Sequence, residues 1–232
     1  MNFKYKNIFF DFDDTLWDIH TNGKEALSET FEQYRLDEKF SSFEEFYGIY
    51  MPKNHELWEK YRSGMIRKKE LVLQRFLYPL QQGGINDEAY ALKMSDDFLE
   101  ATSYKTKLIP YAKEILEYLY PRYRMFILSN GFSEVQYKKL RNSGLDRYFE
   151  KVILSENAEA NKPSPEIFDY ALKNTNSRRK ESVMIGDSWD ADIVGAKNSR
   201  IDQIFLDHEG KTDMDFQPTY LIKSLKELKE IL

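Results

Sequence analysis

The chain has 232 residues, of which 41% are apolar, which is enough for two domains with substantial cores. Its net charge of −5 and its scattered basic residues argue against polymeric nucleic acid and anionic membranes as partners. The absence of cysteine excludes disulfides, thiolate metal sites and cysteine nucleophiles, and it fits a cytoplasmic location.

The first predicted element is a short buried strand at Ile8 to Phe10, which ends in the polar sequence DFDDT. The apolar run is too short for a signal peptide or a membrane span, so we expect neither. Open α/β sheets place their chemistry just beyond the carboxyl ends of their strands, where Asp11 and Asp13 stand. Two carboxylates so close repel each other unless a cation lies between them, which favours a Mg²⁺ site. A solvated acidic turn is the alternative interpretation.

Helical spacing of apolar residues dominates residues 18–105, and this stretch contains no convincing strand. We predict about four helices, with a break or kink at Pro52 and a turn at Gly83-Gly84. A block of helices directly after the first strand predicts a separate helical bundle. The two chain crossings into this bundle are either hinges or ordinary loops.

Strands and helices alternate in the rest of the chain. The predicted strands are Arg124–Leu128, Lys151–Leu154, Ser182–Ile185 and Gln203–Leu206. The predicted helices are Ala112–Tyr120, Val135–Asn142, Ser164–Asn174, Ala191–Ser199 and Leu225–Leu232. Strands separated by helices imply right-handed crossovers and a mostly parallel sheet. The predicted fold class is therefore α/β, with a Rossmann-like core of residues 1–17 and 106–232 and an inserted helical-bundle domain of residues 18–105.

Polar residues follow four of the predicted strands: Asp11, Asp13, Ser129, Lys162, Asp187 and Asp192. Because the carboxyl ends of parallel strands meet at one edge, we expect these acids, the hydroxyl and the lysine to converge. Such a convergence disfavours a purely structural explanation of these residues.

These residues belong to four motifs: DFDDT at Asp11–Thr15, Ser129-Asn130, Lys162-Pro163 and GDSWDAD at Gly186–Asp192. In order and spacing they resemble the four motifs of the haloacid dehalogenase-like (HAD) hydrolases, and the match covers the sheet-forming parts of the chain. The helical insert resembles the helical cap of that family, which closes over the site and chooses the substrate. The resemblance implies a Mg²⁺-dependent phosphohydrolase that works through an aspartyl-phosphate.

Phosphoryl transfer needs a nucleophile, neutralisation of charge and a proton shuttle. The resemblance implies that Asp11 attacks phosphorus and that Asp13 protonates the leaving oxygen and then activates water. Ser129 is expected to donate a hydrogen bond to the phosphoryl group, and Lys162 to supply positive charge. The predicted catalytic residues are therefore Asp11, Asp13, Ser129 and Lys162, and the predicted phosphate-binding residues are Ser129, Asn130 and Lys162.

The predicted Mg²⁺ ligands are Asp11, Asp187 and, by resemblance to the family, the backbone carbonyl of Asp13. Asp192 is expected to support the metal indirectly or through water, since Mg²⁺ usually keeps several waters. Thr15 either forms hydrogen bonds around the nucleophile or only caps the turn.

The presence of Asp13 favours a phosphatase, because the dehalogenases of the family generally lack this aspartate and need no metal. The cap and the sequence DFDDTLWD are similar to bacterial house-cleaning 5′-nucleotidases, so nucleoside monophosphates are the preferred substrates. The alternatives are a phosphatase of another small phosphorylated metabolite, such as phosphoglycolate or a sugar phosphate, and a phosphosugar mutase. A non-catalytic receiver-like domain is disfavoured, because its phosphorylated aspartate lies at a later strand and no helical cap intervenes.

Overall fold

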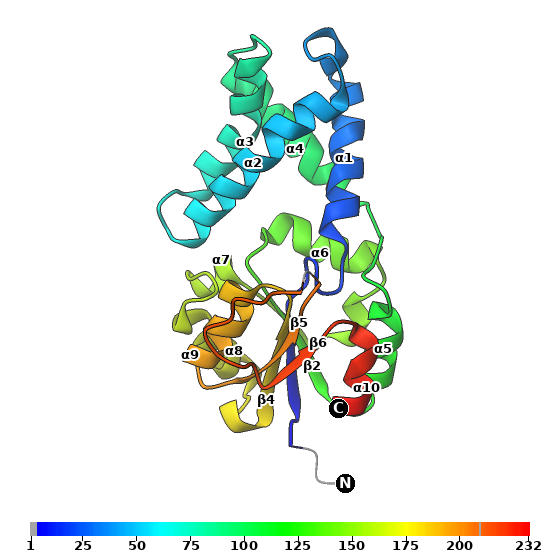
Figure 1. Ribbon diagram of the computed structural model, residues 1–232, viewed down its shortest axis with the longest axis vertical. Coiled ribbons are helices and arrows are strands. Elements are labelled where there is room, and N and C mark those ends of the chain that lie inside the picture. Colours follow the sequence, from blue (N-terminus) through cyan, green and yellow to red (C-terminus); the bar gives the residue numbers. More distant parts are fainter. Residues whose placement is uncertain (1–3, 209) are drawn as a thin grey trace. The chain divides into compact units, whose positions relative to one another are not determined.

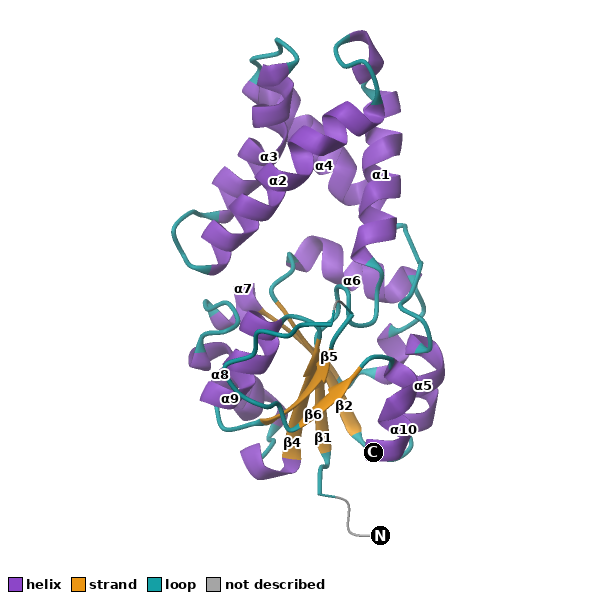
Figure 2. Ribbon diagram, in the orientation of Figure 1, coloured by secondary structure: helices purple, strands orange, loops and turns teal. Residues whose placement is uncertain are grey.

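The computed structural model describes residues 4–208 and 210–232. The chain forms two compact units, which are coloured along the sequence in Figure 1. The core unit comprises Met1–His20 and Thr106–Leu232, and the cap unit comprises Thr21–Lys105. All the strands in the described residues belong to the core unit, as Figure 2 shows.

The described residues of the core unit form one six-stranded sheet in the order β3-β2-β1-β4-β5-β6. Every neighbouring pair is parallel. The strands are β1 (Asn7–Phe10), β2 (Arg124–Ser129), β3 (Lys151–Leu154), β4 (Ser182–Gly186), β5 (Asp202–Leu206) and β6 (Tyr220–Ile222). This order confirms the predicted α/β fold. The strand order reverses at β1, and the carboxyl ends of the strands beside such a reversal border a crevice.

Helices cover both faces of this sheet. They are α5 (Ala112–Leu119), α6 (Ser133–Asn142), α7 (Ser155–Ala158), α8 (Pro165–Thr175), α9 (Gly195–Asn198) and α10 (Leu228–Ile231). Figure 1 shows α5 and α10 on one face and α8 and α9 on the other. Alternate residues of β1 point to opposite faces, so Ile8 and Phe10 join the apolar layer under α5 while Phe9 joins the layer under α8. Burying each of these side chains contributes about 1.5–3 kcal/mol, which fixes the position of the residue that follows β1.

The cap unit is described completely, and it consists of packed helices around an aromatic core. Its helices are α1 (Ile19–Gln33), which begins in the core unit, α2 (Phe43–Arg62), α3 (Lys68–Gln82) and α4 (Glu88–Ser103). The expected break at Pro52 does not occur, because α2 runs through this residue. A proline inside a helix costs about 3 kcal/mol, but Phe46 and Tyr50 before it and Leu57 after it are all buried on α2. Their burial outweighs the lost hydrogen bond.

Two elements near the carboxyl end of the chain differ from the sequence prediction. The predicted helix at Ala191–Ser199 begins earlier, as a π-helix over Trp189–Val194, and continues as α9. Strand β6 was not predicted, because three residues are too few to show an alternation of apolar and polar side chains. Within residues 4–208 and 210–232, no helix has the length and apolar character needed to cross a membrane.

Candidate active site

The polar residues of the four motifs lie at the carboxyl edge of the sheet, all within the core unit. Asp11 directly follows β1, Ser129 is the last residue of β2, and Asp187 directly follows β4. Lys162 lies between α7 and α8, and Asp192 lies in the π-helix after β4. The sheet thus brings together side chains that are far apart in the sequence.

The ammonium group of Lys162 is the centre of this arrangement. It donates hydrogen bonds to Asp11 Oδ1 at 2.5 Å, to Asp192 Oδ1 at 2.7 Å and to the Leu128 carbonyl at 2.8 Å. The side chain is only 2% exposed. Burial alone lowers the pKa of Lys162, but the charges of Asp11 and Asp192 outweigh burial and raise it above its ordinary value. The lysine is therefore held as a buried cation with all three of its N–H groups used.

The side chain of Asn130 fixes the backbone that carries this lysine. Its Nδ2 donates to the Lys162 carbonyl at 3.0 Å, and its Oδ1 accepts from the Lys162 N–H at 2.8 Å. Both ends of the carboxamide are therefore engaged by one residue. A contact of Asn130 with a substrate phosphate stays a prediction.

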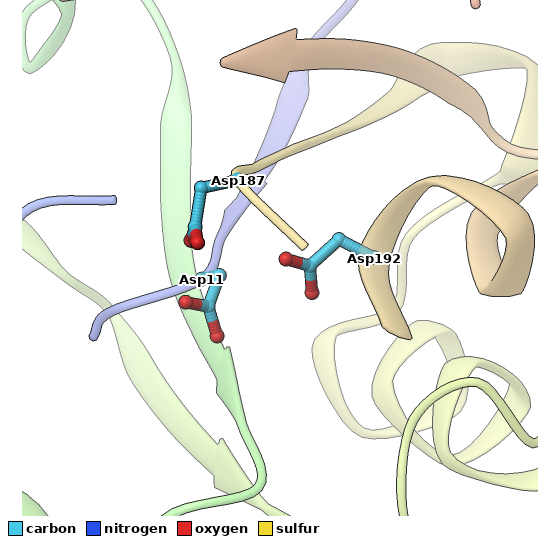
Figure 3. A group of neighbouring side chains, drawn as sticks. All are labelled: Asp11, Asp187 and Asp192. Carbon is cyan, nitrogen blue, oxygen red and sulfur yellow. The ribbon is translucent and has the colours of Figure 1, made fainter. Parts of the chain in front are cut away.

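Three buried or partly buried carboxylates lie close together at this edge of the sheet. Figure 3 shows Asp11, Asp187 and Asp192, and one oxygen of each lies within 4.8 Å of the others. Burial raises the pKa of Asp11 to about 7 and that of Asp187 to about 8, and the charge of a neighbouring aspartate adds to each increase. Crowded carboxyl groups with raised pKa values ionise more easily when a cation lies among them, and Mg²⁺ prefers oxygen ligands of this kind. The donor set therefore fits the predicted metal.

Asp192 differs from the other two acids because both of its oxygens accept hydrogen bonds from N–H groups. Oδ1 accepts from Lys162, and Oδ2 accepts from the Ser188 N–H at 3.1 Å. The Asp192 side chain lies so close to the backbone of residue 186 that this residue must be a glycine, because a Cβ atom there would lie 2.2 Å from Asp192 Oδ2. This geometry suits an indirect role of Asp192 beside a metal rather than direct ligation.

Thr15 links two of the carboxylates. Its hydroxyl donates to Asp187 Oδ1 at 2.8 Å, accepts from the Asp187 N–H at 3.2 Å and lies 3.4 Å from Asp11 Oδ2. Of the two interpretations that the sequence left open for Thr15, these contacts support hydrogen bonding around the nucleophile.

The carboxylate of Asp13 is held by two residues of α6 that the sequence reasoning missed. Gln136 Nε2 donates to Asp13 Oδ2 at 2.7 Å, and Lys139 Nζ donates to Asp13 Oδ1 at 2.8 Å. Both side chains are buried. The sequence held one signal for these two residues. They are three residues apart on the helix that follows Ser129, and residues with this spacing share a helix face.

Comparison with known proteins identifies the family of the chain. A family model described as haloacid dehalogenase-like hydrolase matches residues 8–206. The chain is 31% identical over 232 residues to the HAD-hydrolase YfnB of Bacillus subtilis, covering 99% of this chain and 96% of that protein. It is 31% identical to the pyrimidine 5′-nucleotidase PynA of Streptococcus pneumoniae, covering 98% of this chain and 95% of that protein. For the pyrimidine 5′-nucleotidase YjjG of Escherichia coli the identity is 29%, with 99% and 98% covered.

A solved structure gives the same result. The crystal structure of Bacillus subtilis YfnB bound to magnesium superposes with a TM-score of 0.89 at 28% identity, and the match covers 99% of each chain. The agreement therefore extends from the four motifs to the whole fold. The chain belongs to the haloacid dehalogenase-like hydrolases.

Proposed function

We propose that the protein is a Mg²⁺-dependent phosphomonoester hydrolase that forms an aspartyl-phosphate on Asp11 and acts on nucleoside monophosphates, pyrimidine ones first. The observation that carries the mechanism is the position of the Asp11 carboxylate and its contact with Lys162. This carboxylate follows the central strand, is buried, and is held at one oxygen by the buried cation of Lys162. A nucleophile fixed at one oxygen can present the other to phosphorus without losing further freedom of motion.

In the first half-reaction an oxygen of Asp11 forms a bond to phosphorus while the bond from phosphorus to the ester oxygen breaks. Lys162 balances the negative charge of Asp11 as the phosphoryl group approaches. The Ser129 hydroxyl donates a hydrogen bond to a phosphoryl oxygen. Asp13 gives its proton to the leaving oxygen, and the nucleoside departs as an alcohol.

In the second half-reaction Asp13 accepts a proton from water, and the water oxygen attacks the phosphorus of the aspartyl-phosphate. The bond between phosphorus and Asp11 then breaks, which releases inorganic phosphate and restores the carboxylate. Mg²⁺ held by the carboxylates of Asp11 and Asp187 and the backbone carbonyl of Asp13, with Asp192 in indirect support, would neutralise charge on the phosphoryl oxygens.

The substrate class is supported by the two relatives named pyrimidine 5′-nucleotidases, which match this chain over almost its entire length. The alternatives are hydrolysis of another small metabolite, such as phosphoglycolate or a sugar phosphate, and a phosphosugar mutase. A mutase uses the same groups but protects its phosphoenzyme from water. Release of inorganic phosphate therefore separates the hydrolases from the mutase.

The test is phosphate release from a panel of esters with Mg²⁺ present. The panel contains uridine, cytidine, thymidine, adenosine and guanosine monophosphates, glucose phosphate and phosphoglycolate, and Asp11→Asn is the matched inactive control. We expect the largest kcat/KM for a pyrimidine monophosphate and no turnover by Asp11→Asn. A larger kcat/KM for a sugar phosphate would contradict the substrate class. If no ester in the panel released phosphate, the proposal that the protein is a hydrolase would be contradicted.

A further inference from the structure

Helix α6 presents two buried polar side chains to the loop after β1. Gln136 and Lys139 are 1% and 5% exposed, and their three-residue spacing places them on one helix face. Long polar side chains are rarely buried unless they are paired. Each of these two donates a hydrogen bond to Asp13, one to each carboxylate oxygen. None of the four family motifs contains either residue.

The orientation of the Gln136 amide follows from its partner. While Asp13 is ionised its oxygens only accept hydrogen bonds, so in that state the amide atom that faces Asp13 is the NH₂ group. The same nitrogen donates to Ser129 Oγ at 2.8 Å, which uses both of its N–H bonds. The amide oxygen is buried and accepts no hydrogen bond from residues 4–208 or 210–232. An unpaired buried acceptor costs about 1–3 kcal/mol, so packing alone does not explain a glutamine at this position.

Two donors converge on the Ser129 oxygen. Besides Gln136, the Gly131 N–H donates to Ser129 Oγ at 3.0 Å. Gly131 also leaves space for the amide, because a Cβ atom there would lie 2.1 Å from Gln136 Nε2. A hydroxyl oxygen has two lone pairs, and both are now occupied. The hydroxyl proton of Ser129 is therefore left to be donated to another acceptor, which is what a phosphoryl oxygen requires.

Lys139 holds the other oxygen of Asp13 and the same loop. Its Nζ lies 2.8 Å from Asp13 Oδ1 and 4.0 Å from the centre of the Trp17 ring. A cation over an indole ring contributes about 0.5–2 kcal/mol. Trp17 forms a β-bridge with Asp13, so Lys139 contacts both ends of this tight loop.

We infer that Gln136 and Lys139 are positioning residues, which hold the Asp13 carboxylate by both oxygens for proton transfer. Gln136 has a second task, because it also makes Ser129 a donor toward the phosphoryl group. This inference rests on the proposed hydrolysis. It predicts that loss of Gln136 affects both proton transfer and phosphate binding, whereas loss of Lys139 affects proton transfer alone.

The variants Gln136→Met and Lys139→Met keep the length and burial of each side chain and remove its donors. Lys138→Met is the matched control, because Lys138 is the exposed neighbour on the same helix. For both test variants we expect turnover of an alkyl phosphate to fall about 10–100-fold, which is less than the 10²–10⁴-fold that general acid–base catalysis contributes as a whole, because Asp13 itself remains. With para-nitrophenyl phosphate, whose leaving group hardly needs a proton, aspartyl-phosphate should accumulate as a burst. The control should keep the parent rate.

Inorganic phosphate as an inhibitor separates the two roles. We expect Gln136→Met to raise the inhibition constant of phosphate severalfold, as Ser129→Ala should, and Lys139→Met to leave it unchanged. In an Asp13→Asn background Lys139→Met should not slow turnover further, because residues that act through one group are not additive. In the same background Gln136→Met should still weaken phosphate binding, because its contact with Ser129 does not involve Asp13. Gln136→Leu, which also removes the NH₂ donor and adds no charge, replaces Gln136→Met if that variant fails to fold.

Thermal unfolding of each variant shows whether a loss of turnover comes with a loss of stability, as a merely structural role would require. A folded Gln136→Met or Gln136→Leu variant that turns over alkyl phosphates at the parent rate would overturn the inference. So would a Lys139→Met substitution that slows turnover as much in the Asp13→Asn background as in the parent. A parent protein without phosphatase activity would instead contradict the proposed function.

Discussion

Replacing Lys162 by Met should destabilise the core unit more than any exposed lysine substitution. The change removes the cation that contacts Asp11 and Asp192 and leaves both carboxylates buried at the centre of the site. Removing one partner of a buried ion pair costs about 3–5 kcal/mol. For a chain of this size, each kcal/mol corresponds to a change in Tm of about 2–4 °C, so the expected decrease is about 6–20 °C.

The loss should depend on pH in a defined direction. Burial already raises the pKa of Asp11 to about 7, and Lys162 opposes that increase, so its removal raises the pKa further. A carboxyl group with a raised pKa in the folded state binds its proton more tightly when folded than when unfolded. Its contribution to stability is complete below the unfolded pKa near 3.9 and is lost as the pH rises through the folded value. Lys162→Met should therefore lose little stability near pH 5 and most near pH 8.

Urea unfolding of the metal-free protein at the two pH values measures this effect. Lys6→Met is the matched control, because Lys6 lies 2.8 Å from Glu181 with its side chain 65% exposed. An exposed pair of this kind contributes about 0–1 kcal/mol, and the control should show no trend with pH. The reasoning is wrong if Lys162→Met unfolds within about 1 kcal/mol of the parent near pH 8, or loses the same stability at both pH values.

Three further predictions concern the metal and the intermediate. A chelator should abolish phosphate release and added Mg²⁺ should restore it, because Asp11 and Asp187 otherwise face an anionic substrate; full turnover in excess chelator would contradict this. The metal-free parent should lose stability as the pH rises from about 4 to 8, because the pKa values of Asp11 and Asp187 are raised to about 7 and about 8. In thermal scans, stability should fall less steeply with pH when Mg²⁺ is present or in Asp187→Asn. Equal slopes would refute the assignment of this pH dependence to Asp11 and Asp187. Intact-mass spectrometry should detect aspartyl-phosphate in Asp13→Asn given para-nitrophenyl phosphate and none in Asp11→Asn, where an adduct would mean another nucleophile.

The backbone of the site could be predicted from the sequence because its signals are local. A buried apolar run that ends in DFDDT identifies β1 and the residue after it, and parallel pairing brings the other motif ends to the same edge. The fold class and the family followed from these signals, and the comparisons confirm both. That Asp11 and Lys162 lie at the same edge needed no information beyond the parallel direction of the strands.

Side-chain partners could not be predicted in the same way, because they depend on tertiary packing. Gln136 and Lys139 are ordinary polar residues of an amphipathic helix until the Asp13 loop lies against them. The passage of α2 through Pro52 depends on the apolar face that continues on both sides of the proline. In each case the local sequence favours one structure, but burial of side chains in the folded unit stabilises a different one.

The charges of the site explain why a divalent cation fits the described residues. The ionisable side chains that the geometry gathers are Asp11, Asp13, Asp187, Asp192, Lys139 and Lys162. Lys139 balances Asp13, and Lys162 can balance only one of the two acids that it contacts. Two negative charges then remain. Burial raises the pKa of Asp187 to about 8, and repulsion from the charge of Asp11 adds to the rise. In the proposed mechanism one divalent cation would cancel this excess, and a phosphate ester that carries its own negative charge would then meet less repulsion as it approaches Asp11.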